Sequence, residues 1–169
     1  AAREMLTHAR AEFLELGYAL GLAQVDLALA QVAHNDDCHE EALTRALATG
    51  ERFHALGSLR GRTDSARLAA IAAFDLGDLT VAAAQAREAY TLATEGRTDP
   101  WGQVESSSVL AQVALAEGDL ESASDYVGVA RGVTLDDAEP TQHRELTAAW
   151  LHLAAGRIDD AVACIGTAR

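Results

Sequence analysis

The chain has 169 residues, 49% of them hydrophobic and 5% aromatic, and its formal net charge is −13 with a pI of about 4.7. This length suits one domain with a substantial core, which excludes wholesale disorder. The acidity disfavours direct binding to nucleic acid or to an anionic membrane surface, and no apolar run is long enough to span a bilayer. Two distant cysteines do not make a disulfide scaffold, so we expect a cytoplasmic location.

Helical periodicity and the turn residues predict an all-α chain, and no alternating pattern predicts a strand. We expect a single domain over 1–169 that begins with a leading helix. Four helix pairs then follow, together covering about 22–55, 64–95, 100–132 and 141–168. In chain order the expected helices are 2–16, 22–34 and 38–55, 64–76 and 79–95, 100–117 and 120–132, and 141–155 and 158–168.

The helix pairs repeat at a nearly constant spacing along the chain, with a period of about 40 residues. Small residues recur at matched positions of the first helix and of the second helix in each pair. Where two antiparallel helices cross closely, a side chain larger than alanine would force them apart. These structural anchors are Ala30, Ala42, Ala70, Ala82, Ala111, Ala123, Ala149 and Ala161.

Turn residues mark the joints of the repeat. Gly77 and Gly118 suit the left-handed position that ends a helix, and Asp37 stands where later copies have glycine. Asp37 with Glu40 also has the spacing of a capping box. The expected helix starts elsewhere are Asp78, Asp119, Thr63 or Asp64, and Asp99 followed by Pro100. The segments FLELGYALG (13–21) and FHALGSLRG (53–61) are also similar to each other and lie one repeat period apart.

The anchors and the Gly-Asp turns together resemble the tetratricopeptide repeat (TPR) from about residue 22 to 169. The period is longer than that of the standard repeat, which is about 34 residues. The large aromatic residue early in the first helix is also missing. The longer period and the F-x-x-L-G loops resemble the TPR arrays of large bacterial transcriptional regulators. The chain starts without methionine and ends inside an expected helix, so we expect a segment of such a larger protein.

The resemblance implies a right-handed superhelix, an α–α solenoid that binds protein or peptide partners on a concave face lined by the first helices. The groove residues carried over from the family and favoured here are Gln31, Arg67, Ile71, Phe74, Gln112 and Trp150. Further positions on the same face are Gln24, Leu27, His34, Asp64, Glu105, Ser108, His143 and Leu146. Because Arg67 stands almost alone among acids, we expect no basic clamp for an acidic chain end.

The stretch HNDDCHE (34–40) gathers His34, Cys38 and His39 with three acids. Zinc prefers about four such ligands in a tetrahedron, and this spacing is unlike known zinc motifs. We therefore interpret the stretch as the first joint of the repeat and assign no metal ligand there. A metal-dependent helical protein using 34–41 remains the least favoured alternative.

No pairing of nucleophile and base is evident, and the serines of ESSSVL (105–110) lack a nucleophile elbow. We therefore expect no enzyme activity and no cofactor. The predicted function is a protein–protein interaction module, the scaffold or sensor part of a bacterial regulatory protein. The alternative is self-association, such as a homodimer, through the apolar residues of the last helix.

Overall fold

The computed structural model describes residues 2–95, 99–133 and 138–168, and every regular element within these ranges is an α-helix. In chain order the helices are α1 (Ala2–Glu15), α2 (Ala19–Asn35), α3 (His39–Ala55), α4 (Leu59–Asp75), α5 (Leu79–Glu95), α6 (Pro100–Glu117), α7 (Leu120–Gly132), α8 (Ala138–Ala154) and α9 (Ile158–Thr167). The first and second helices of the four pairs are α2 with α3, α4 with α5, α6 with α7 and α8 with α9.

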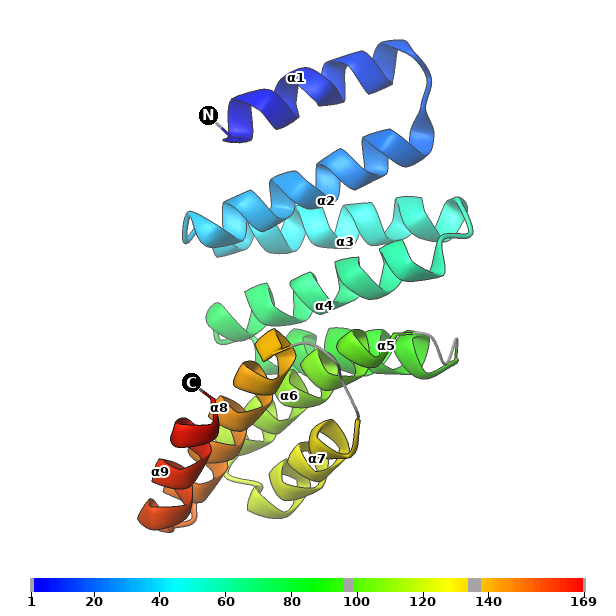
Figure 1. The fold of residues 1–169 in the computed structure, drawn as a ribbon. Helices are drawn as coiled ribbons and strands as arrows, with labels where there is room; N and C mark the ends of the chain where they lie inside the picture. Colours follow the sequence, from blue (N-terminus) through cyan, green and yellow to red (C-terminus); the bar gives the residue numbers. More distant parts are fainter. Residues whose placement is uncertain (1, 96–98, 134–137, 169) are drawn as a thin grey trace.

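Each helix packs against the next, and the stack runs from α1 at one end to α8 and α9 at the other (Figure 1). The first helices also touch one another, α2 with α4, α4 with α6 and α6 with α8. Over the described part of the chain, no such contact joins α1, α3, α5, α7 and α9 to each other. A stack that is closer on one side bends toward that side, so the first helices form the inner wall. The expected all-α solenoid is confirmed, and its stacked pairs fit a TPR-like repeat.

The joints between helices use residues with positive φ. Five glycines take this left-handed conformation, which costs them nothing because they lack a Cβ atom: Gly17, Gly57, Gly77, Gly118 and Gly156. Asp37 has φ 58° at the α2–α3 joint, in the place where later copies use glycine. The expectation for Gly77 and Gly118 is confirmed. The capping box predicted at Asp37 is wrong, because Cys38 precedes α3 and makes no side-chain cap.

Three of the four expected helix starts are capped as the sequence predicts, by Asp78, Asp99 and Asp119. The carboxylate of Asp99 accepts a hydrogen bond from the Gly102 backbone N–H at 2.8 Å, and that of Asp119 accepts one from Ser122 at 3.0 Å. The start expected at Thr63 or Asp64 is wrong. The helix α4 begins at Leu59, four to five residues earlier, with Ser58 as its cap.

The earlier start of α4 explains why a second glycine follows the repeated F-x-x-L-G motif four residues later, at Gly21 and Gly61. Phe53, near the end of α3, is 2% exposed and lies directly over Gly61 in the first turn of α4. A Cβ atom on Gly61 would sit 2.6 Å from the ring atom Cε1 of Phe53 and closer still to two others. At the previous joint, Gly21 lies in the same way beneath Tyr18 and Phe13. The glycine at this position therefore makes room for an aromatic ring that closes the joint between two hairpins.

Alanines form the seams between the helices. The eight anchor alanines are all buried, none more than 3% exposed. One cluster joins Ala111 and Ala123 of the third pair to Ala149 and Ala161 of the fourth, so it spans two hairpins. The core is thus a series of thin contacts between neighbouring hairpins, as expected for a stack of repeats.

A buried carboxylate ties the first three helices together. Asp26 of α2 is 5% exposed and bonds to Arg10 of α1 at 2.6 Å and to Arg52 of α3. A buried carboxylate is stable only when its charge is paired and hydrogen-bonded. The two arginines meet this need and fix α1 to the first hairpin.

Candidate protein-binding groove

The inner wall carries an apolar hollow of about 630 Å³, formed by α4, α6 and α8. Its lining residues, together called the apolar hollow here, are Phe74, Gln112, Leu115, Ala116, Trp150, Leu153 and Ala154. Trp150 is 64% exposed and Leu153 45% exposed, although both are large and apolar. Exposed aromatic surface gathered in one concave place is typical of a binding site.

The lining residues lie at the C-terminal ends of three first helices. Phe74 is the last residue but one of α4, and Leu153 holds the same place in α8. Asp75 and Glu117 end α4 and α6, so carboxylates lie next in sequence to this lining. Helix C-termini carry negative partial charge. The apolar hollow is therefore set in surroundings that favour cations.

A second hollow of about 430 Å³ lies farther along the inner wall, between α2, α4 and the start of α6. Its lining is mainly polar and includes Gln31, Arg67 and Trp101. Arg67 forms an ion pair with Glu105 at 2.9 Å, and the indole N–H of Trp101 donates to the same carboxylate at 2.5 Å. The charge of Arg67 is thus already balanced by an acid of the neighbouring helix.

Asp64 lines the same polar hollow, and its burial raises the pKa of its carboxyl above the ordinary value. The positive charges of Arg67 and Arg60 oppose this shift, and Asp99 adds to it. The ionised form of Asp64 is therefore less stable here than in water, because burial removes part of its hydration and the two nearby arginines compensate only in part.

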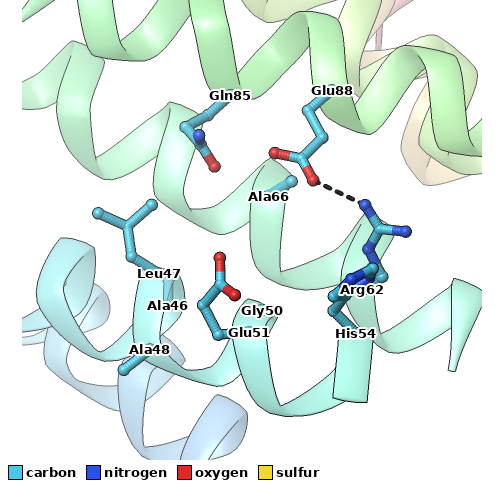
Figure 2. Close-up of a pocket in the computed structure, with 10 residues that line it drawn as sticks. All are labelled: Ala46, Leu47, Ala48, Gly50, Glu51, His54, Arg62, Ala66, Gln85 and Glu88. Atoms are coloured by element: carbon cyan, nitrogen blue, oxygen red, sulfur yellow. Dashed lines mark hydrogen bonds and ion pairs between the residues drawn. The ribbon is translucent and has the colours of Figure 1, made fainter. Parts of the chain in front are cut away.

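A third hollow, of about 420 Å³, lies between the outer helices α3 and α5, over α4 (Figure 2). Leu47, Glu51 and His54 of α3 face Gln85 and Glu88 of α5 across it. Arg62 of α4 bonds to Glu88 at 3.2 Å and closes one side. Its mixed lining offers no concentration of apolar surface like that of the apolar hollow.

Five of the six groove residues predicted from sequence line the two hollows of the inner wall. Phe74, Gln112 and Trp150 lie in the apolar one, and Gln31 and Arg67 in the polar one. Ile71 lines neither hollow and packs, partly buried, against the core cluster of α4, α5 and α6. Whether these residues bind a partner stays a prediction.

The further inner-face positions expected from sequence do not all line the two hollows. Ser108 is fully buried, so the expectation that it faces the groove is wrong. The side chain of His143 lies outside the described residues. Sequence reasoning missed Leu115 and Leu153, which follow Gln112 and Trp150 by three residues and so lie one turn along the same helix faces.

The serines of ESSSVL are packing residues of α6. Ser106 and Ser107 are fully buried, and their hydroxyls donate to the carbonyls of Gly102 and Gln103 at 2.5 and 2.6 Å. Back-bonding of this kind removes the hydroxyl from solvent and from any substrate.

The HNDDCHE stretch forms the α2–α3 joint, as expected, and its two histidines contact a carboxylate of α4, outside the stretch. His34 and His39 both face Asp75, at the end of α4, whereas Cys38 is exposed and contacts its own turn through the carbonyl of Asp36. The grouping of Cys38 with the two histidines, considered from sequence, is therefore not the arrangement in the structure.

No family model matches the chain, and no curated protein does. Among solved structures, the crystal structure of the protein MamA aligns over 99% of this chain and 90% of its own, with 14% sequence identity and a TM-score of 0.48. At so low an identity, the function has to be argued from the chain's own residues. None of the helices in the described ranges combines the length and the apolarity that a membrane span requires.

Proposed function

We propose that this chain is an interaction module whose concave face binds a segment of another protein, anchored by a bulky apolar side chain in the apolar hollow. The observation that carries the proposal is Trp150, which is 64% exposed in a hollow shared by three consecutive hairpins. Aromatic residues in concave sites supply a large share of binding energy at protein interfaces. Phe74 lines the same hollow from α4 and Leu115 from α6.

The partner segment carries basic residues beside its apolar anchor. Asp75 and Glu117 end the helices that form the hollow, and the chain as a whole has a net charge of −13. Complementary charge steers partners together and raises the association rate. An acidic segment would meet repulsion instead, and Arg67 is already engaged by Glu105.

The wider setting we propose is a bacterial regulatory protein in the cytoplasm, in which this single domain over 1–169 acts as scaffold or sensor. The support is the long period of the repeat together with the F-x-x-L-G joints, features shared with the TPR arrays of such regulators. Reading the complete coding sequence tests this setting. An ATPase or DNA-binding domain in the same polypeptide would support it, and a secretion leader would refute it.

The binding proposal is tested by selecting peptides on the immobilised chain from a random library and measuring their affinity by calorimetry. We expect selected peptides to combine a bulky apolar residue with basic neighbours. Leu153→Ala should weaken binding at least tenfold. The matched control is Leu47→Ala, a leucine exposed to a similar degree on the outer helix α3. Equal affinities of both variants and the unaltered chain would refute the proposal.

A second candidate function is self-association through α9. Ile158, Val162 and Ile165 are exposed and follow one another at helical spacing, which makes an apolar stripe. Sedimentation should then show association that rises with concentration and is abolished by Val162→Glu. A chain that stays monomeric at high concentration would exclude this candidate.

A further inference from the structure

Two histidines and an aspartate from three helices converge beside the α2–α3 joint. His34 lies in the last turn of α2, His39 is the first residue of α3, and Asp75 is the last residue of α4. The Nδ1 atoms of His34 and His39 lie 3.6 and 3.8 Å from the same Oδ2 atom of Asp75. One donor atom from each residue can be chosen so that all three lie within 4.8 Å of one another.

These contacts leave polar atoms unsatisfied. Both Nδ1 atoms are buried, and neither has a hydrogen-bond partner among the described residues. Distances of 3.6 and 3.8 Å are too long for hydrogen bonds. Buried polar atoms without partners are costly and rare in native proteins, and a bound ion is one of the ways in which proteins satisfy them. Here two of them lie against one carboxylate oxygen.

The spacing suits a cation held between the three donors. Zinc binds nitrogen and oxygen ligands at about 2.0 to 2.2 Å, so two ligands of a tetrahedral ion are roughly 3.4 Å apart. The two Nδ1–Oδ2 distances of 3.6 and 3.8 Å are close to this value, and the donor atoms of the two histidines lie within 4.8 Å of each other. Imidazole nitrogen is a donor for zinc-like transition metals, whereas calcium and magnesium require oxygen ligands.

We propose that His34, His39 and Asp75 bind one divalent transition-metal cation of the zinc class, through the two Nδ1 atoms and the carboxylate. Three protein ligands leave a fourth position open for water or for a donor from outside the chain. The Oδ1 atom of the exposed Asp37 lies 4.0 Å from Nε2 of His39, which is beyond hydrogen-bond distance, so we assign Asp37 no role in the site. Cys38 is not a ligand. The proposed metal site does not rest on the partner binding proposed above, although Asp75 also lies beside the apolar hollow.

The test uses the full chain, free of any histidine tag and stripped with a chelator. Titration with zinc chloride in a calorimeter should show one equivalent bound per chain with micromolar affinity or better. Addition of cobalt chloride should give the visible absorption of a tetrahedral cobalt site. Magnesium chloride should give neither signal, because its coordination preferences differ.

Three variants assign the ligands. His39→Gln and Asp75→Asn should each weaken zinc binding at least tenfold, and Cys38→Ser should leave it unchanged. The matched control is His54→Ala, a histidine in the outer hollow away from the site. Circular dichroism of each variant in chelator establishes that it is folded, and Asp75→Asn, at an exposed helix end, is the one least able to disturb the fold.

The melting temperature separates a metal site from a simple ion pair. Zinc should raise it in the original chain and in His54→Ala, and should raise it much less in Asp75→Asn. Three results would overturn the proposal: zinc that does not bind, zinc that binds equally well to Asp75→Asn, or a site that takes magnesium as readily. A metal-free chain whose stability falls on loss of His39, and which zinc does not stabilise, would identify an ion pair instead.

Discussion

The glycine beneath Phe53 offers a direct measurement of how tightly the hairpins are joined. In most helix interiors, replacing glycine with alanine stabilises a protein by about 0.5 to 1 kcal/mol, because alanine has less backbone freedom to lose. Gly61→Ala should do the opposite. Its Cβ atom would fall within 2.6 Å of Phe53 Cε1, far inside the usual carbon–carbon contact distance of about 3.5 Å.

The expected loss of stability in Gly61→Ala can be estimated from the packing around Phe53. Phe53 is 2% exposed, so its ring cannot move away into solvent and must displace its neighbours. Overfilling a packed site costs about 1 to 3 kcal/mol, which exceeds the propensity gain of about 1 kcal/mol. Gly128→Ala is the matched control, since that glycine lies within α7 and its Cβ atom would meet nothing within 4 Å. The two variants should differ in stability by about 2 kcal/mol, with opposite signs.

Urea unfolding followed by circular dichroism provides the free energies. A double-mutant cycle with Phe53→Leu tests the mechanism, because a smaller side chain should relieve the clash. We expect a favourable coupling of at least about 0.5 kcal/mol between Phe53→Leu and Gly61→Ala. If Gly61→Ala proves as stable as Gly128→Ala, and no coupling is found, then the ring does not require a glycine and the joint is looser than described.

Three further predictions address the seams, the buried charge and the pH dependence. Ala82→Leu, at a fully buried anchor, should lower the unfolding free energy by about 1 to 3 kcal/mol in urea titrations, and an unchanged value would contradict close helix packing. Arg52→Ala removes one partner of buried Asp26, and calorimetry should show a lower melting temperature, with a stability loss of up to about 3 to 5 kcal/mol tempered by Arg10. The raised pKa of Asp64 means that its contribution to stability is fullest below the ordinary carboxyl pKa and is lost as pH rises through the folded value. Asp64→Asn should therefore remove that decline from the pH–stability profile, and an unaltered profile would refute the assignment.

The helices and joints were predictable because their signals are local. Gly77 and Gly118 end helices in the left-handed conformation, and Asp99 caps α6, for reasons contained within a few residues of chain. The start of α4 was misplaced because the GRTD tetrapeptide at 61–64 resembles a helix start, whereas the ring of Phe53 over Gly61 places that glycine inside the helix. Phe53, which determines where α4 begins, lies eight positions before Gly61 and packs across the joint between α3 and α4.

The candidate sites depend on contacts between hairpins, and this limits what sequence could predict. The repeat placed Gln112 and Trp150 at matching positions on successive first helices, and Phe74 one turn further along α4, and these three line one hollow. The histidine–aspartate cluster could not be predicted from sequence, because Asp75 lies far along the chain from His39 and outside the HNDDCHE stretch. Only the stacking of α4 on the first hairpin brings that carboxylate to the two imidazoles.

Both candidate sites lie across the alanine-rich seams between hairpins, so ligand binding at either site affects how the hairpins hold together. The seams contain few large side chains, so each hairpin is held to the next by thin contacts, and stability is close to a sum of neighbouring interfaces. The histidine–aspartate cluster joins the first hairpin to the second, and the apolar hollow joins the second to the third and fourth. A ligand in either place contacts neighbouring hairpins that are joined by alanine-rich seams, so its binding energy opposes their separation.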